Sequence, residues 1–404
     1  MYASIKMIAK DMTKAVQREL WSHNQRSFIL SVLPHRNLAS GSGKITTKSS
    51  NLKHSLTRKF SVQSCEMVKA RKYVLMKHFT DKPKRTDLKL VEEELPALKN
   101  GEYLAEAEYL SVDPYMRVYT QRYPVGTTMI GAQVAKIIES KHPDYPVGKR
   151  IVGYLGWRTH TIVNPKIDES DKVMVQSPYI LPDIGDLPSS LGLGVLGMPG
   201  NAAYFGLIEI CQPKSGETIV ISGAAGAVGS HVGQIAKNLG LTVIGLCGSD
   251  DKSKWLTEEL GFDAVINYKT TSVAASLRKV APQGVDCYFD NVGGDISSTV
   301  IYQMKPFGRI SACGSISSYE SNASSLPKCT LLQPAIVFNQ LKMEGFIVTR
   351  WHNRWFEGIQ QNLQWIREGK LCYHETVTKG FDNMFDAFVG MLQGQNVGKA
   401  IVKV

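Results

Sequence analysis

The spacing of hydrophobic positions separates two patterns within residues 67–404. Between residues 67 and 190, short stretches alternate apolar and polar residues and are punctuated by Pro, Gly and Asp. The stretches are KYVLMKHF, EYLAEAEYLSV, AQVAKIIES and KRIVGYLGWRTHTIV. Such alternation is typical of strands with one buried face. We therefore expect a β-rich or barrel-like unit here.

From about residue 195 the pattern changes to a β-branched strand followed by a helix, repeated. The strand and helix pairs are ETIVISG with AVGSHVGQIAKNLG, LTVIGLCG with DDKSKWLTEELG, and VDCYFDNVGG with DISSTVIYQM, while DAVINY and GRISACGS add strands. This alternation predicts a parallel, doubly wound α/β sheet. After about residue 356, the amphipathic helix GIQQNLQWIREGK precedes a last helix and strand, NMFDAFVGML and GKAIVKV, which could complete either unit.

The first of these strands runs into a glycine turn, IVISGAAGAVGSHVG, with the spacing Ala-x-Gly-x-x-Gly. Gly226 can let backbone approach a pyrophosphate, and Gly229 lets the following helix pack closely on the sheet. A buried strand packed on a small-residue helix is the alternative. Four further strand ends, at 248–252, 267–268, 290–294 and 313–319, are rich in small, polar or phenolic residues. Because ligands bind at the carboxyl ends of parallel strands, these ends together predict a crevice.

The second strand end indicates which dinucleotide is bound. An NAD site needs Asp or Glu about 20 residues after the glycine turn to hold the ribose 2′-hydroxyl. This chain has Cys247-Gly248-Ser249 there, followed by Lys252 and Lys254, which favours the 2′-phosphate of NADP(H). Asp250 and Asp251 leave an alternative in which they cap the next helix and Lys252 is a solvated helix residue.

Composition and charge exclude several function classes. The chain has 404 residues, of which 43% are hydrophobic and 21% charged, and no apolar run is long enough to span a membrane. Of the net charge of +11, residues 1–65 carry +9, which leaves +2 for the rest. A nearly neutral body shows no electrostatic footprint for nucleic acid. Seven cysteines without any Cys-x-x-Cys do not support a disulfide framework or a zinc knuckle.

The basic N-terminal extension, residues 1–66, is interpreted as a segment outside the folded domains. Lys6, Lys10, Lys14 and Arg18 fall on one face of an amphipathic helix, and a Ser/Thr-rich stretch follows. The segment 58–61, Arg-Lys-Phe-Ser, resembles a matrix-protease site with cleavage after Phe60. These features are typical of a mitochondrial transit peptide and would place the protein in the matrix. The alternative is translation from Met67 and a cytoplasmic protein.

Five motifs together resemble the zinc-free branch of the medium-chain dehydrogenase/reductase family, from Met67 to Val404. They are MPGNAAYFGL (198–207), SGAAGAVG, FDNVGG (289–294), CGSISSY (313–319) and NVGKAIVKV (396–404). The resemblance implies a GroES-like catalytic domain, 67–193, to which the C-terminal segment 356–404 returns, and a Rossmann domain, 194–355, that binds NADP(H). It also implies a homodimer.

Carried over to matching positions, the resemblance implies a set of cofactor contacts. These are Ala225, Gly226, Ala227, Val228 and Gly229 around the pyrophosphate, Lys252 at the 2′-phosphate, Tyr268 and Asn291 along the adenosine and ribose, Cys313, Gly314, Ser315, Ile316, Ser317, Ser318 and Tyr319 with Phe346, Ile347 and Val348 around the nicotinamide, and Asn396 near the end of the chain.

No metal site is expected. Related alcohol dehydrogenases hold a catalytic zinc with Cys and His from the first domain, but this chain has no cysteine between Cys65 and Cys211. SVDPYMR (111–117) stands at the place of the catalytic Cys, and IGAQV (130–134) replaces the usual Gly-His-Glu. A substrate carbonyl must therefore be polarised without metal.

The resemblance implies transfer of the NADPH hydride to the β-carbon of a lipid-derived α,β-unsaturated aldehyde or ketone. Tyr319 is the first candidate to donate a hydrogen bond to the developing enolate oxygen, and Tyr115 is the second. Alternatively, Tyr319 is an ordinary tyrosine of a surface turn, and Tyr115 only packs against its neighbours. Arg117 could attract a substrate carboxylate or be a solvated charge. Thr349 stands where many relatives carry an aromatic residue beside the substrate cleft. The enone that this protein prefers is therefore expected to differ from the substrates of those relatives.

Two other functions stay open at this point. The same scaffold serves NADPH quinone reductases, which do not need an enol-stabilising tyrosine. Some members of the superfamily are non-catalytic NADPH-binding proteins. The CGSISSY loop with Tyr319 favours enone reduction over both.

Overall fold

The computed structural model of the chain describes residues 67–166, 177–319 and 329–404. The basic extension, with its expected helix and cleavage site, lies outside the described residues. In the described ranges, none of the helices combines the length and the apolar character that crossing a bilayer requires.

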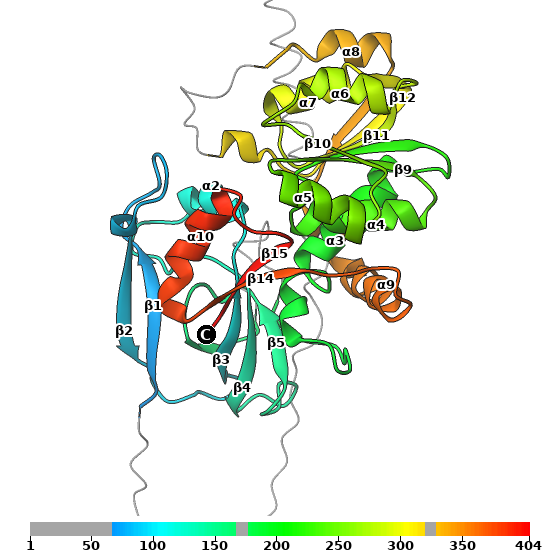
Figure 1. Cartoon of the computed structure of the whole chain (residues 1–404). Coiled ribbons are helices and arrows are strands. Elements are labelled where there is room, and N and C mark those ends of the chain that lie inside the picture. Colours follow the sequence, from blue (N-terminus) through cyan, green and yellow to red (C-terminus); the bar gives the residue numbers. More distant parts are fainter. Residues whose placement is uncertain (1–66, 167–176, 320–328) are drawn as a thin grey trace, which may run out of the picture. The chain divides into compact units, whose positions relative to one another are not determined.

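The β-rich part consists of a seven-stranded sheet and a two-stranded ribbon (Figure 1). The ribbon pairs β1 (Lys69–Leu75) with β2 (Leu88–Glu94). The sheet has the order β14-β15-β3-β4-β5-β7, and β6 pairs with β3. Its strands are β3 (Tyr103–Ser111), β4 (Gln133–Ser140), β5 (Arg150–Gly153), β6 (His160–Val163), β7 (Tyr179–Ile180), β14 (Glu375–Lys379) and β15 (Lys399–Lys403).

The C-terminal strands therefore complete the sheet of the β-rich part. Strand β15 runs antiparallel to β3, with Ile401 opposite Ser111, and parallel to β14. Helix α10 (Met384–Leu392) buries Phe388 in the core beneath this sheet, next to Trp157 and Met116. The short helix α2 (Tyr115–Tyr119) follows β3 and contributes Met116 to the same core.

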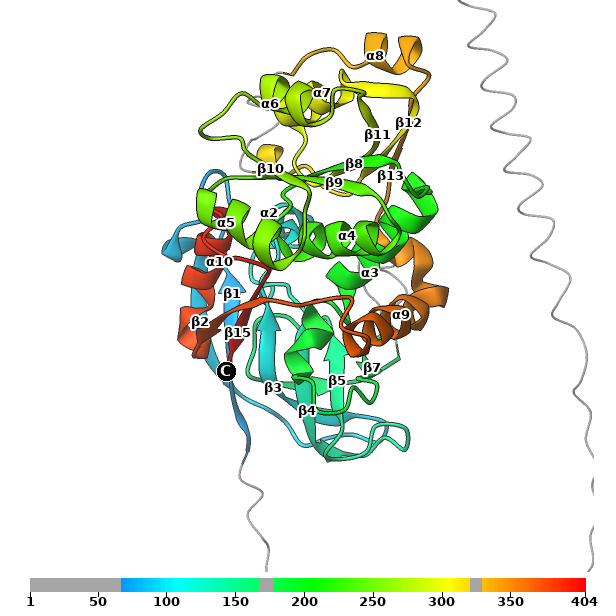
Figure 2. The same ribbon diagram turned by 45° about the vertical axis from the view of Figure 1, so that its right-hand side comes forward.

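The second part is a six-stranded parallel sheet of order β10-β9-β8-β11-β12-β13. The strands are β8 (Thr218–Ser222), β9 (Thr242–Cys247), β10 (Ala264–Asn267), β11 (Val285–Asp290), β12 (Met304–Ala312) and β13 (Lys342–Gly345). Helices cover both faces (Figure 2). They are α3 (Met198–Phe205), α4 (Ala227–Asn238) and α5 (Asp250–Lys254) on one face, and α6 (Val273–Val280), α7 (Gly294–Ile301) and α8 (Gln333–Phe338) on the other. The predicted doubly wound α/β sheet is confirmed.

Short 3₁₀ or π turns connect these elements. They are η1 (Arg85–Asp87), η2 (Thr120–Arg122), η4 (Ser189–Leu193), η5 (Gly206–Cys211), η6 (Trp255–Glu259), η7 (Ile316–Ser318), η8 (Val348–Arg354) and η9 (Phe381–Asn383). Helix α9 (Trp355–Arg367) packs on α3, where the Asn201 amide donates to the Trp355 carbonyl at 3.0 Å. Helix α9 thus packs on a helix of the parallel-sheet part, whereas β14 and β15 join the sheet of the β-rich part.

Strand order reverses between β8 and β11, which are neighbours in the sheet although two strands separate them in sequence. At such a switch point the loops after the two strands diverge and leave a crevice at their carboxyl ends. The glycine turn after β8 and the FDNVGG turn after β11 both lie at this point. The fold therefore brings the predicted binding motifs to one place.

Candidate functional site

The glycine turn between β8 and α4 forms the centre of the candidate site. Gly226 is the N-cap of α4, and no side chain caps this N-terminus. A Cβ at Gly229 would lie 2.5 Å from the carbonyl oxygen of Gly223 and 2.8 Å from the Cα of Ala224, so a larger residue would push the helix away. A helix N-terminus with free N–H groups and a positive dipole end fits the pyrophosphate of a dinucleotide.

The C-terminal segment lies against this turn, as the placing of Asn396 near the cofactor requires. The Gly398 N–H donates to the Ala225 carbonyl at 2.9 Å, and Gly398 forms a parallel bridge with Gly226. The Asn396 side-chain amide donates to the Gly398 carbonyl at 2.8 Å. Residues 396–398 therefore close one side of the dinucleotide turn.

The end of β9 carries the residues predicted for the adenosine end. A Cβ at Gly248 would lie 2.7 Å from the Tyr268 hydroxyl and 3.2 Å from Cε of Lys269, so the loop after β10 covers this glycine. The Lys252 ammonium donates to the Gly394 carbonyl at 2.7 Å. Burial lowers the pKa of Lys252, and the charge of Lys269 lowers it further. Two ammonium groups that repel each other in this way suit a phosphate.

Neither Asp250 nor Asp251 is the N-cap of the helix that follows β9. Ser249 is the N-cap of α5 and accepts a hydrogen bond from the Lys252 N–H, so the alternative in which an aspartate caps this helix is wrong. Asp250 and Asp251 lie in the first turn of the helix. The Asp250 carboxylate accepts a hydrogen bond from the Asn267 amide at 2.7 Å.

Asp290, at the end of β11, fixes the turns on the other side of the crevice and is 3% exposed. Its carboxylate accepts hydrogen bonds from the Ser222 hydroxyl (2.9 Å), the Tyr288 hydroxyl (2.9 Å), the Val292 N–H (3.0 Å), the Gly293 N–H (2.9 Å) and the Ser297 hydroxyl (2.6 Å). Its carbonyl accepts from the Cys313 N–H at 2.8 Å. The turns after β11 and β12 are therefore held as one unit.

Asn291 and the CGSISSY loop meet on this unit. The Asn291 side-chain amide donates to the Ser222 carbonyl at 2.8 Å, and the Ile316 N–H donates to the Asn291 carbonyl at 3.3 Å. The Ser317 hydroxyl donates to the Val292 carbonyl at 2.6 Å. The structure thus brings the predicted contacts from 291 and 313–319 together at the strand ends.

Tyr319 ends this loop and is half-buried. Its hydroxyl accepts a hydrogen bond from the Ser315 N–H at 3.3 Å, which leaves its own proton available to a partner. Burial raises the pKa of Tyr319, and electrostatic interaction with Tyr119 of α2 raises it further. The Tyr319 phenol therefore keeps its proton at neutral pH.

The predicted contacts at 346–348 divide between core and surface. The Phe346 ring packs against Trp351 at a centroid distance of 5.3 Å and closes over Gly206, so it belongs to the core. Val348 is buried, whereas Ile347 is 41% exposed. Thr349 follows at the start of η8 and is half-buried.

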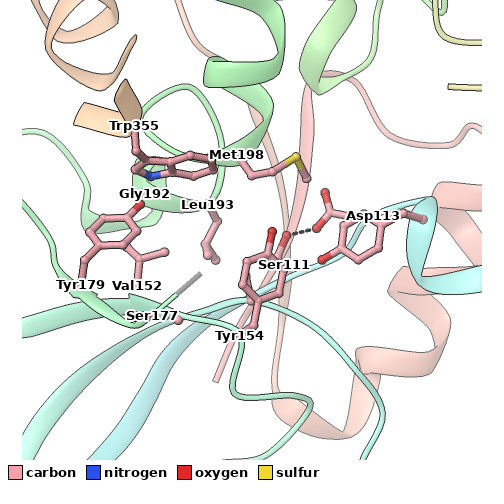
Figure 3. A pocket seen from close by; sticks show the side chains of 13 residues that line it. Ser111, Asp113, Val152, Tyr154, Ser177, Tyr179, Gly192, Leu193, Met198 and Trp355 are labelled. Carbon is pink, nitrogen blue, oxygen red and sulfur yellow. Dashed lines mark hydrogen bonds between the residues drawn. The ribbon is translucent and has the colours of Figure 1, made fainter. Parts of the chain in front are cut away.

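A small cavity lies where the two parts meet, lined by Tyr115 and Tyr154 from the β-rich part and by Met198 and Trp355 from the other (Figure 3). Counted as space open to the centre of a water molecule, it measures about 20 Å³, enough for one water. The Tyr115 hydroxyl is fully buried and makes no hydrogen bond of regular geometry. Burial raises its pKa, with Tyr154 and Asp113 contributing in the same direction.

The floor of this cavity contains a buried ion pair. The Lys399 ammonium, on β15, donates to the Asp113 carboxylate at 2.7 Å and to the Val112 carbonyl at 2.8 Å. Ser111 donates its hydroxyl to the other oxygen of Asp113. Lys399 is 2% exposed and Asp113 4%. The negative charge beside Tyr115 is therefore neutralised within the site.

Arg117 does not have either of the environments considered for it. The residue is 1% exposed, so its interpretation as a solvated charge is wrong. Its guanidinium lies 5.5 Å from the centroid of the Phe79 ring and donates to the Asp81 carbonyl at 2.9 Å. A cation enclosed in this way is not presented to a substrate carboxylate; it anchors helix α2 instead.

The sequence analysis missed Tyr154, Tyr179 and the ion pair of Asp113 with Lys399. A lysine in the otherwise apolar strand GKAIVKV was a signal of a buried partner, because lysine is almost never fully buried unless paired. Tyr154 carried no such signal, since a tyrosine after a strand is ordinary. Among the described residues, no three His, Cys, Asp or Glu side chains form a group that could hold a metal ion.

Comparisons with known proteins agree with this geometry. A family model described as the N-terminal domain of oxidoreductase matches residues 71–170, and one described as zinc-binding dehydrogenase matches residues 227–365. Prostaglandin reductase 1 of Bos taurus is 48% identical over 339 residues, which cover 83% of this chain and 100% of that protein. The NADP⁺-dependent 2-alkenal reductase of Nicotiana tabacum is 34% identical over 352 residues, 84% of this chain and 98% of the relative.

A solved structure matches as well. The crystal structure of CurA in complex with NADPH from Vibrio vulnificus has a TM-score of 0.75 at 36% identity and covers 83% of this chain and 99% of that one. The resemblance drawn from the sequence motifs is therefore confirmed. The chain belongs to the medium-chain dehydrogenase/reductase family.

Proposed function

We propose that this protein is an NADPH-dependent reductase of the carbon–carbon double bond of α,β-unsaturated aldehydes and ketones. One observation carries the proposal: a relative named prostaglandin reductase 1 matches along its whole length at 48% identity. The relative named 2-alkenal reductase acts with the same cofactor type, and the structure named for its NADPH complex shares the fold. Enone reduction is therefore favoured over quinone reduction and over cofactor binding alone.

The residues at the strand ends fit NADPH. The uncapped N-terminus of α4 would hold the pyrophosphate, and Lys252 with Lys269 would face the 2′-phosphate. When bound, NADPH supplies the hydride for the β-carbon of the substrate. Ordering of 290–293 and 313–317 by Asp290 would fix the loops that flank the nicotinamide.

The cavity residues account for the second requirement, which is stabilisation of the enolate. The phenol hydroxyls of Tyr115 and Tyr154, which burial keeps protonated, can donate to an oxygen on which negative charge develops. Because Lys399 neutralises Asp113, the cavity suits an uncharged carbonyl group better than a carboxylate. The neutral environment also avoids a charge that would oppose the enolate.

The thiol of Cys313 fits an enzyme that handles electrophiles. Burial raises its pKa to about 12, and the charge of Asp290 contributes. Since the thiolate is the nucleophilic form, this thiol stays unreactive toward an enal bound beside it. The exposed Cys329 and Cys372 lie elsewhere on the chain.

Steady-state assays with NADPH and three substrates test the proposal. We expect turnover of 4-hydroxynonenal or 15-oxo-prostaglandin, with a small quinone as the comparison. Turnover of the quinone alone would identify a quinone reductase. Absence of turnover with tight NADPH binding would identify a cofactor-binding protein.

We also propose that the protein is a homodimer built on the edge strand β13. Its neighbourhood exposes large apolar side chains: Phe338 is 81% exposed, Val337 70% and Phe307 66%. Exposed apolar groups beside an unpaired strand edge are typical of an interface. Light scattering should give twice the chain mass, and Phe338→Glu should shift it toward the monomer. A monomeric wild-type protein would refute this.

A further inference from the structure

Tyr154 is a large polar side chain of the cavity to which neither the motifs nor the family match assigns a role. It follows β5, and its side chain reaches toward Ser111 and Asp113 (Figure 3). The Tyr115 hydroxyl lies next to the Tyr154 hydroxyl without a bond of regular geometry. Two phenol hydroxyls therefore converge on a space of one water molecule, from a helix and from a strand end.

Ser111 and Asp113, which line the same side of the cavity, already form hydrogen bonds. Ser111 donates its proton to Asp113, and Lys399 is bound to Asp113 and to the Val112 carbonyl. Tyr179 and Trp355 line the opposite side of the cavity and lie next to each other (Figure 3). On the side of the cavity where Asp113 lies, the hydroxyls that do not bind Asp113 are those of Tyr115 and Tyr154, whereas the Tyr179 hydroxyl lies on the side of Trp355.

We propose that Tyr154 is a catalytic residue and that its hydroxyl, together with that of Tyr115, binds the carbonyl oxygen of the substrate. The inference rests on the proposed function. The space admits one oxygen atom rather than a whole substrate, so the carbonyl end enters it. Met198 begins α3 of the parallel-sheet part and lines the same cavity.

The chemistry of this arrangement balances. Hydride adds to the β-carbon, the π electrons of the double bond move toward the α-carbon and the carbonyl, and the oxygen gains negative charge. The two phenols donate hydrogen bonds to this oxygen and keep their protons, because burial raises the pKa of both. Water supplies the proton that the α-carbon takes to give the saturated carbonyl product.

Replacement of the hydroxyl alone tests the role. Removal of one oxyanion donor costs about 10²–10³ in kcat, and since Tyr115 would remain we expect Tyr154→Phe to lower kcat for an enone roughly tenfold to a hundredfold. The affinity for NADPH, measured by fluorescence titration, should not change. Tyr73→Phe is the matched control, because it removes a phenol that donates to the Asp382 carbonyl at 3.0 Å in the same part of the protein.

A spectrum reports the contact without turnover. With NADP⁺ in place of NADPH, 4-phenyl-3-buten-2-one should bind with a red-shifted absorption, because hydrogen bonds to a carbonyl polarise the conjugated system. We expect a smaller shift in Tyr154→Phe and an unchanged shift in Tyr73→Phe. Equal kcat values and equal spectra in Tyr154→Phe and Tyr73→Phe would overturn the assignment. It would also be overturned if the loss of kcat in Tyr154→Phe were explained by a loss of thermal stability. If the wild-type protein itself fails to reduce enones, the proposed function falls with it.

Discussion

Lys252 provides a direct test of cofactor choice, because its ammonium is predicted to bind the 2′-phosphate that distinguishes NADPH from NADH. In the structure it donates to the Gly394 carbonyl at 2.7 Å. Lys252→Ala removes the charge but leaves the Ser249 cap of α5, which uses only the backbone N–H of residue 252. The substitution should therefore change the phosphate site and not the helix.

The expected loss of NADPH affinity depends on the hydrogen bonds that Lys252 makes with and without the cofactor. A hydrogen bond to a charged group contributes about 1.5–3 kcal/mol, which corresponds to roughly a 10- to 150-fold change in Kd. Lys252 must give up or share its bond to the Gly394 carbonyl when it meets a phosphate, and Lys269 would still face that phosphate. For both reasons we expect the affinity for NADPH to fall by the lower end of this range, about tenfold.

Calorimetric titration with NADPH and with NADH measures the effect. We expect Lys252→Ala to weaken NADPH and to leave NADH nearly unchanged, since NADH has no 2′-phosphate. Lys254→Ala is the matched control on the same helix: its side chain is 70% exposed and 3.9 Å from Glu258, and pairs of this kind contribute little. Equal affinity of the unmodified protein for both cofactors, or equal losses in the two variants, would refute the reasoning.

Three further predictions concern mechanism, metal and stability. Tyr319→Phe should lower kcat for an enone roughly tenfold to a hundredfold with little change in NADPH affinity; full activity would show that Tyr319 is not needed beside Tyr115 and Tyr154. Dialysis against EDTA or phenanthroline should leave kcat intact, whereas stoichiometric zinc in the purified protein would contradict a metal-free mechanism. Burial lowers the pKa of His231 to about 4, so the folded state resists a proton that the unfolded chain accepts. The free energy of unfolding should fall by about 2 kcal/mol between pH 6.5 and pH 5, and urea titrations should show a smaller fall in His231→Gln.

Most of the parallel sheet could be predicted, because each buried strand reads as an apolar run that ends at a turn. Strand β13 could not. Its sequence, Lys342-Met343-Glu344-Gly345, is short and polar, and it forms a strand only because β12 offers a free edge. The register of β15 against β3 could not be predicted from the sequence either, because pairing across 290 residues of chain leaves no local pattern.

The site was predictable where backbone geometry sets the residue type. Gly229 is needed because a Cβ would meet the strand end, and this constraint appears in the sequence as a spacing of glycines. Side chains that depend on distant partners were harder to assign. Arg117 resembles a solvated charge until Phe79 covers it, and Tyr154 resembles a loop residue until α2 brings Tyr115 to it.

Six consecutive residues near the C-terminus, 394–399, contact three parts of the candidate site. Gly394 accepts the Lys252 ammonium, Gly398 donates to Ala225 of the dinucleotide turn, and Lys399 neutralises Asp113 at the floor of the cavity. One stretch of backbone therefore contacts the residues proposed to bind the 2′-phosphate, the pyrophosphate and the substrate carbonyl. Because reacting atoms must be held within a fraction of an ångström, a shift of this segment would misplace cofactor and substrate together.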